Sequence, residues 1–155
     1  MFRISTLVIV VATVLTATIG SMLTSRGMAW YATIARPAWT PPGSVIGMVW
    51  TGIFILTAIA ATISYNRLAQ DDIRTWIVLL FIVNAVLNIG WSWVFFNLHT
   101  FNGAIVEMLA LEGTVLALIY LLLPREPLAA LLLVPYALWV GFATYLTVTI
   151  ADLNR

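Results

Sequence analysis

Residues 74–96 read RTWIVLLFIVNAVLNIGWSWVFF, and the fold class follows from this stretch. Its one charge stands at the first residue. A membrane-spanning helix needs about 20 mainly apolar residues, because each residue rises 1.5 Å through roughly 30 Å of hydrocarbon. The apolar run is continuous, whereas the strands of a membrane β-barrel alternate in polarity over about ten residues. The stretch therefore predicts a transmembrane helix.

Four further apolar stretches surround this one in the sequence. They cover residues 4–23, 44–65, 103–123 and 128–150. The connections between the last four of the five segments are short, so consecutive helices should be antiparallel neighbours. We therefore expect an all-α integral membrane protein, a bundle of five transmembrane helices in a single domain that covers residues 1–155.

The composition excludes several classes of protein. Of 155 residues, 63% are hydrophobic and 8% are charged, and the mean hydropathy is +1.05. A soluble domain of this size could not hide that much apolar surface, so the lipid bilayer is the expected surrounding. The net charge of +1 gives no field that would attract nucleic acid. Cysteine is absent, no metal-ligand cluster is visible, and we predict neither a metal site nor a cofactor.

Residues 24–43 form the one long connection that the sequence predicts. It contains Trp30 and Tyr31, then Trp39 between prolines, then Pro41 and Pro42. Loops of this length in compact proteins often act as lids or binding elements. The alternative is an aromatic anchor at the membrane interface, which would explain Trp30 and Tyr31 equally well.

The third apolar stretch carries a polar and aromatic face. Asn84, Asn88, Trp91 and Phe95 are spaced four, three and four residues apart, which places them on one side of a helix. An unpaired amide in hydrocarbon costs several kcal/mol, so this face should turn toward protein or toward a cavity. Two interpretations stay open: the amides bond neighbouring helices together, or they border a ligand site.

Glu107 and Glu112 are the only acids well inside a predicted span. An ionisable residue at that depth costs at least ~2.5 kcal/mol, which favours a functional role. The alternative for Glu107 is a protonated carboxyl group that bonds a neighbouring helix. The two acids are five residues apart, about 140° around a helix, so they do not form a pair on one face. Nothing in the sequence assigns a role to Glu112.

Motifs in four of the five predicted helices and in the long connection resemble the signature of the TspO/MBR family, the tryptophan-rich sensory proteins and the translocator protein. The motifs are Trp30-Tyr31, Arg36-Pro37-x-Trp39-x-Pro41-Pro42, Trp50, Asn88-x-x-Trp91-x-x-x-Phe95-Phe96, Glu107, Pro135-Tyr136-x-x-Trp139-x-x-Phe142-Ala143-Thr144 and Leu153-Asn154. The chain departs from the pattern at Asn84, where many members have glutamine. No basic residue follows Tyr145 closely enough to form the sterol motif of the animal members, so sterol binding as in animals is not expected.

The resemblance implies a fold and a function. The five helices would enclose a tryptophan-lined pocket within the membrane, capped by the long first loop. The protein would be a receptor or sensor that binds porphyrins such as protoporphyrin IX, or other flat hydrophobic ligands, in that pocket. It implies a homodimer in a bacterial cell membrane. The ligand-binding residues carried over are Tyr31, Trp39, Pro41, Pro42, Trp50, Asn84, Asn88, Trp91, Phe95, Glu107, Trp139, Phe142 and Ala143.

Two alternatives to simple binding remain. Some members are associated with light- and oxygen-dependent breakdown of porphyrin, for which Trp50 and Trp139 would be the catalytic candidates. A tetrapyrrole or small-molecule transporter is the other, with Glu107 carrying a proton. Transport has less support, because the chain shows no repeated halves that could alternate in access.

Overall fold

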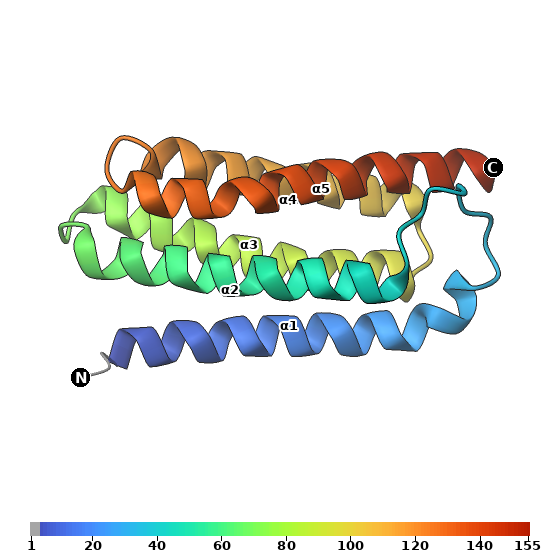
Figure 1. Cartoon of the computed structure of the whole chain (residues 1–155), viewed down its shortest axis with the longest axis horizontal. Helices are drawn as coiled ribbons and strands as arrows, with labels where there is room; N and C mark the ends of the chain where they lie inside the picture. The colour runs from blue at the N-terminus through green and yellow to red at the C-terminus, as the bar shows by residue number, and fades with distance from the viewer. Residues whose placement is uncertain (1–3) are drawn as a thin grey trace.

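The computed structural model describes residues 4–155 and is helical throughout, apart from the connections (Figure 1). The helices are α1 (Ile4–Tyr31), α2 (Gly43–Arg67), α3 (Asp72–Phe96), α4 (Phe101–Leu122) and α5 (Pro127–Leu153). Each of the five is long and apolar enough to cross a membrane. The prediction of an all-α, five-span membrane protein is confirmed.

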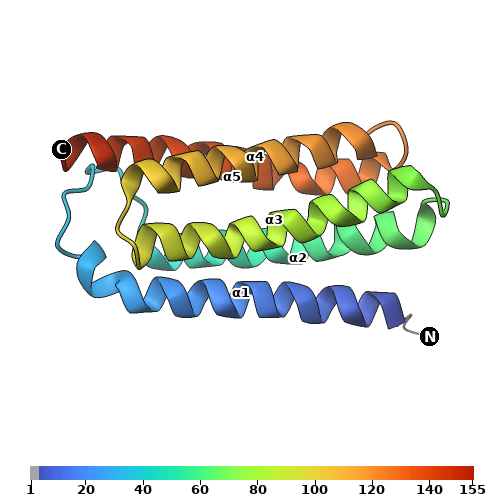
Figure 2. The same ribbon diagram turned by 180° about the vertical axis from the view of Figure 1, so that it is seen from behind.

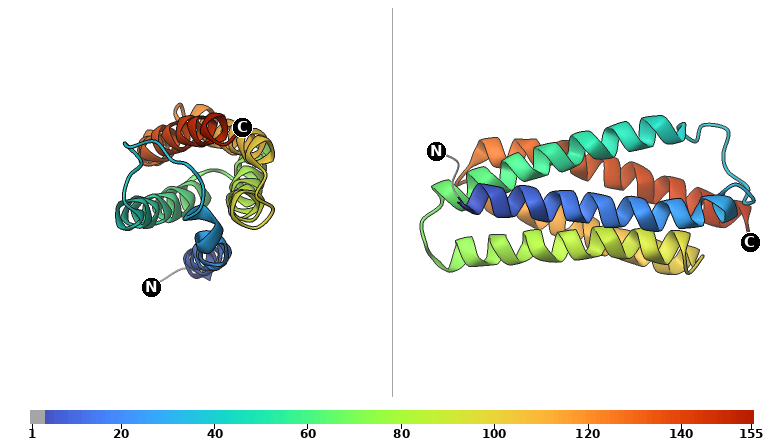
Figure 3. Two further views of the ribbon diagram at one scale, coloured as in Figure 1. Left: turned by 90° about the vertical axis from the view of Figure 1, so that its right-hand side faces the viewer. Right: turned by 90° about the horizontal axis from the view of Figure 1, so that it is seen from below.

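The helices form a closed ring when the bundle is seen along its axis (Figure 3). Helix α1 packs on α2 and α3, α5 packs on α2 and α4, and α3 packs on α4. The order around the ring is therefore α1, α2, α5, α4 and α3. The connections from α1 to α2 and from α3 to α4 lie at one end of the bundle, together with the C-terminus (Figures 1 and 2). We call this the loop end.

The helices begin where the sequence supplies suitable residues. The side chain of Asp71 accepts a hydrogen bond from the Arg74 backbone N–H at 2.9 Å, which caps α3. Pro127 occupies the first turn of α5, where its missing N–H costs nothing. The turn from α3 to α4 needs a left-handed residue, and His99 supplies it with φ of 55°. The exposed His99 ring stacks on Trp30 at 4.2 Å between ring centroids.

The first helix is longer than the sequence predicts. Helix α1 continues to Tyr31, so its connection to α2 covers residues 32–42 and not 24–43. Trp30 and Tyr31 consequently belong to a helix and not to a loop. Within the extension, Gly27 lets α1 approach α3 closely: a Cβ at Gly27 would overlap the backbone of Phe96. That approach brings the last turn of α1 onto the aromatic end of α3.

Apolar side chains cover the outside of the bundle as well as its interior. Val86 is 63% exposed and Leu138 is 71% exposed, and lipid tails are as apolar as these side chains. The interior holds two hydrophobic clusters along the α4–α5 contact and a third of aromatic residues at the loop end. Hydrophobicity alone consequently does not distinguish the core from the lipid-facing surface in this protein.

Candidate ligand-binding site

A cavity of about 450 Å³ lies under the connection between α1 and α2. Its size is within the range of 300–1,000 Å³ that small-molecule pockets usually have. We call it the loop cavity. Its lining residues are Met28, Tyr31, Ile34, Arg36, Pro37, Thr40, Pro41, Pro42, Gly43 and Ile46. Three of the expected ligand-binding residues, Tyr31, Pro41 and Pro42, therefore line the same cavity.

Arg36 gives the loop cavity a positive charge. Its guanidinium carbon lies 4.8 Å from the centroid of the Tyr31 ring, in a cation–π arrangement. The ion pairs among residues 4–155 join Arg67 to Glu126 and Arg155 to Asp152, so no carboxylate of the described chain neutralises Arg36. The cavity thus combines aromatic and proline surfaces with one cation that is available to an anionic group.

Asn154, just beyond α5, holds the connection in place. Its Nδ2 donates to the Ala35 carbonyl at 2.8 Å, and the Ala35 N–H donates to Asn154 Oδ1 at 3.0 Å. The same Nδ2 also donates to the Ile150 carbonyl at 2.8 Å within α5. Because one amide pairs with both backbone groups of Ala35, the roof of the loop cavity is fixed to the C-terminal end of the bundle.

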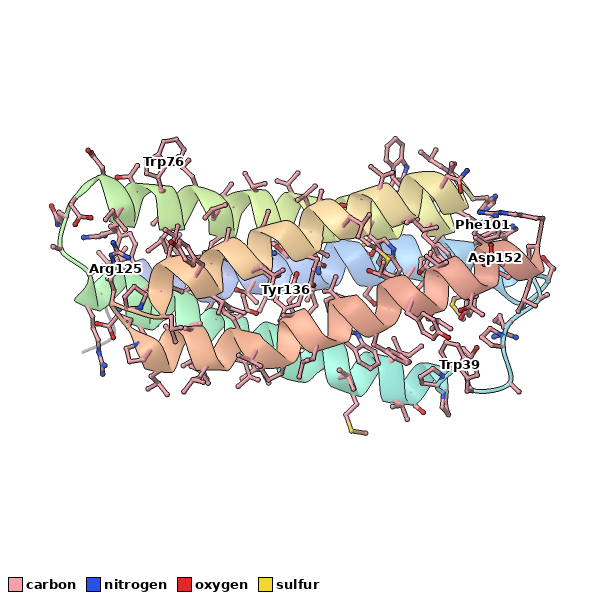
Figure 4. All side chains as sticks on the ribbon, turned by 90° about the horizontal axis from the view of Figure 1, so that it is seen from above. Trp39, Trp76, Phe101, Arg125, Tyr136 and Asp152 are labelled. Atoms are coloured by element: carbon pink, nitrogen blue, oxygen red, sulfur yellow. The ribbon has the colours of Figure 1, made fainter. Side chains whose placement is uncertain are left out.

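Trp39 packs on α5 and does not line the loop cavity. Its ring stacks on Tyr145 at 5.4 Å between centroids and meets Phe142 edge-on at 6.0 Å. Phe142 in turn lies 5.2 Å from Trp139. Figure 4 shows Trp39 at the loop end, the end that also carries Asp152 and Phe101. Three expected residues, Trp39, Phe142 and Trp139, therefore lie together, and Ala143 follows Phe142 on the same helix.

Trp50 lies on α2 and does not line the loop cavity. It follows Ile46, which lines the cavity, by about one turn of α2. Its ring meets Tyr136 edge-on at 5.9 Å and Phe54 at 5.7 Å. Trp50 and Trp139 both pack against the same buried cluster, which is centred on the α4–α5 contact. The two candidate tryptophans thus flank a common core.

Asn84 and Asn88 join three helices through a buried phenol. Asn88 Nδ2 donates to the Tyr136 hydroxyl at 3.1 Å, and that hydroxyl donates to Asn84 Oδ1 at 3.1 Å. Asn84 Nδ2 then donates to Thr114 Oγ1 at 2.8 Å. The chain of bonds links α3, α5 and α4 in the middle of the bundle, where Figure 4 shows Tyr136. The helix-bonding interpretation of the two amides is realised, and we call these four residues the polar network.

Trp91 and Phe95 belong to an aromatic cluster at the loop end. Their rings stack at 5.7 Å, and Phe95 meets Tyr31 of the loop cavity at 6.1 Å. Neither ring lines the loop cavity. Phe95 therefore contacts the cavity residue Tyr31, whereas the Trp91 ring contacts Phe95 and Phe96.

The two acids of α4 lie on different sides of that helix. The Glu107 carboxylate rests against Gly90 of α3, where a Cβ would lie 3.3 Å from its Oε1. Both of its oxygens and Glu112 Oε2 are buried, without a well-formed hydrogen bond to a residue in the range 4–155. Within that range, no group of three His, Cys, Asp or Glu side chains could hold a metal ion.

The expected residues do not surround one cavity. Tyr31, Pro41 and Pro42 line the loop cavity, whereas Asn84 and Asn88 reach a separate apolar groove between α1, α2 and α3. Sequence reasoning missed Tyr136 and Thr114 as hydrogen-bond partners of the two amides. It also missed that Asn154 bonds the connection between α1 and α2 at Ala35. Tyr136 and Asn154 stand inside motifs that the sequence shows, but only the tertiary contacts give them these roles.

Comparison with known proteins agrees with this architecture. The model of the TspO/MBR family matches residues 7–153. The tryptophan-rich protein TspO of Bacillus cereus is 36% identical over 136 residues, which are 88% of each chain. The human translocator protein is 30% identical and matches 78% of this chain and 72% of its own. The tryptophan-rich sensory protein of Cereibacter sphaeroides is 28% identical over 89% of this chain and 84% of its own.

The family match and the five spans make this a multi-pass membrane protein, and its bacterial relatives fit a cell membrane. Every motif residue named in the sequence analysis except Asn154 lies inside the matched region. The chain belongs to the TspO/MBR family of membrane sensory and translocator proteins.

Proposed function

We propose that this protein is a receptor for flat hydrophobic carboxylic acids of the porphyrin type, with protoporphyrin IX as the test ligand, and that the ligand binds in the loop cavity. The observation that carries the proposal is the pairing of Arg36 with the Tyr31 ring at the wall of that cavity. A cation that forms no ion pair within residues 4–155, beside an aromatic and proline surface, suits a planar ligand that ends in a carboxylate.

The binding energy would come from two sources. Burial of the macrocycle against Tyr31, Pro41 and Pro42 contributes about 25 cal/mol per Å² of apolar area removed from water or lipid headgroups. A propionate would accept a charge-assisted hydrogen bond from Arg36. Trp50 follows the lining residue Ile46 by about one turn of α2, so tryptophan fluorescence should report an occupant.

The experiment is a titration in the dark of the detergent-purified protein with protoporphyrin IX, followed by tryptophan fluorescence. We expect saturable quenching, with affinity lowered about tenfold in Arg36→Gln, since one charge-assisted hydrogen bond contributes roughly 1.5 kcal/mol. The dimethyl ester of protoporphyrin IX lacks the carboxylates, so it should bind Arg36→Gln and the unmodified protein with equal affinity. Arg26→Gln, a change of another arginine that does not line the cavity, should behave like the unmodified protein.

Two results would contradict the proposal. Linear quenching without saturation would show that the porphyrin only partitions into detergent. An equal loss of affinity for the acid and for the ester in Arg36→Gln would show that Arg36 does not meet a carboxylate. Trp139→Phe tests the tryptophan-lined site suggested by the family resemblance, because a ligand beside Trp139 would lose affinity in that variant with little change in fold.

A further inference from the structure

A second and larger hollow lies outside the site considered so far. A groove of about 780 Å³ runs between α1, α2 and α3. It shares none of its lining residues with the loop cavity. It begins at Ile4 and Ser5 of α1, near the end of the bundle opposite the loop end, and reaches inward to Asn88 and Tyr136. The groove is therefore a separate site with its own entrance.

The shape of the groove suits a single hydrocarbon chain. Alanine lines it on all three helices, at Ala12, Ala61 and Ala85, so a channel remains between the larger side chains. Along α3 its lining extends from Arg74 to Ile89, which are 15 residues and therefore about 22 Å apart at 1.5 Å per residue. One leaflet of the bilayer core is about 15 Å thick, half of roughly 30 Å. An acyl chain that enters from one leaflet fits within this length.

The outer end of the groove carries a cation. Arg74 lines the groove in the first turn of α3, and its guanidinium carbon lies 4.1 Å from the centroid of the Tyr65 ring. No carboxylate among residues 4–155 forms an ion pair with it. Arginine favours phosphate, since its planar fork donates two parallel hydrogen bonds. The groove thus has a cation at its outer end and an apolar lining further in. A phospholipid has the matching order, with a phosphate in its headgroup followed by an apolar acyl chain.

We infer that this groove binds one anionic phospholipid of the surrounding membrane, with the phosphate at Arg74 and one acyl chain between α1, α2 and α3. The bound chain fills the space that α1 leaves between its N-terminal half and the rest of the bundle. This site is independent of the loop cavity, and the inference does not depend on the porphyrin proposal.

The experiment measures lipid selectivity by electron paramagnetic resonance on the full chain in bilayers, with phosphatidylglycerol or phosphatidylcholine spin-labelled near the end of one acyl chain. We expect a motionally restricted component with about fivefold preference for phosphatidylglycerol, the effect of one arginine near an anionic lipid. Arg74→Gln should remove the preference. Arg125→Gln, at the same end of the bundle but outside the groove, should retain it (Figure 4).

A second pair of variants tests the acyl chain. Ala12→Phe places a ring inside the groove and should remove the restricted component for both lipids. Val11→Phe adds the same ring to the exposed face of α1 outside the groove and should leave that component unchanged.

Three outcomes would overturn the inference. If the unmodified protein restricted the two lipids equally, the groove would have no selectivity for the anionic headgroup. A preference that survives Arg74→Gln would place the charge recognition elsewhere. Loss of the preference in Arg74→Gln together with an unchanged restricted component in Ala12→Phe would reduce the site to a headgroup contact on the surface, with no chain in the groove.

Discussion

Helix α1 and the group formed by α3, α4 and α5 are all apolar enough to span a membrane but are held in the bundle by different means. The three-helix group is joined by the polar network, whose bonds run from Asn88 to Thr114 through the Tyr136 hydroxyl. Helix α1 instead meets α3 through glycine: Gly27 lies against the Phe96 backbone. It also receives a hydrogen bond at the Leu23 carbonyl from Asn97 Nδ2, at 3.0 Å.

The difference shows what arranges helices when the solvent is lipid. Moving an apolar side chain from lipid to a helix contact gains little, so close packing and hydrogen bonds decide which faces meet. Gly27 of α1 packs tightly against α3, whereas the N-terminal half of α1, which bonds α2 through Ser5 and Asn66, borders the groove. Four substitutions test this division, each at a different kind of contact.

The largest effect is expected from Gly27→Leu. The new side chain would overlap the Phe96 backbone, which cannot move aside as the end of a flexible side chain can. We expect α1 to separate from α3 at the loop end and stability to fall by about 1–3 kcal/mol. The measurement is the free energy of unfolding in a titration with dodecyl sulfate. Gly113→Leu is the control, because nothing lies within 4 Å of a Cβ there; equal losses in both variants would refute the close contact.

The next largest effect is expected from Tyr136→Phe. The ring is retained, but both bonds of the hydroxyl are lost and the two amides are left partly unpaired in the core. Hydrogen bonds between membrane helices average about 0.6 kcal/mol, so the loss should be about 1 kcal/mol in the same titration. Tyr120→Phe, at a residue that is 79% exposed, should have no effect. An unchanged stability of Tyr136→Phe would mean that packing alone holds the three helices.

A smaller and local effect is expected from Asn154→Ala. The connection over residues 32–42 loses its bonds to the C-terminal end of α5. We expect hydrogen exchange of that connection to accelerate by about twofold to tenfold, since a net hydrogen bond contributes about 0.5–1.5 kcal/mol. The unfolding midpoint should hardly change. Asp152→Ala removes a nearby exposed ion pair with Arg155 and provides the comparison. Equal exchange in the two variants would show that Asn154 does not fix the connection.

The smallest effect is expected from Glu126→Gln. Glu126 Oε2 lies 3.6 Å from Arg67 Nη1, and the Arg67 side chain is 61% exposed. Ion pairs of this kind contribute about 0–1 kcal/mol, so the thermal midpoint in detergent should stay within a degree or two. A loss of about 1 kcal/mol in the free energy of unfolding, as expected for Tyr136→Phe, would contradict this expectation. It would show that the ion pair at the end opposite the loop end stabilises the bundle as much as the polar network does.

The candidate site was only partly predictable. The spacing of Asn84, Asn88, Trp91 and Phe95 correctly places all four on one helix face. It does not show that the amides bond Tyr136 and Thr114, while Trp91 and Phe95 stack in a different part of the bundle. Residue spacing fixes the direction of a side chain around its own helix, but the partner opposite depends on how neighbouring helices rotate and approach. The ligand-binding roles of these residues stay predictions.

The sequence by itself determined the number of spans, the helical class and most helix ends, because hydrocarbon thickness and backbone hydrogen bonding leave few alternatives for five long apolar runs. Only the tertiary structure shows that α1 ends at Tyr31, with Gly27 in its last turns packed against the Phe96 backbone. It also decided the ring order and the division between loop cavity and groove. Both follow from contacts between distant residues, and in a lipid solvent these contacts depend on shape and hydrogen bonds that apolar composition does not encode.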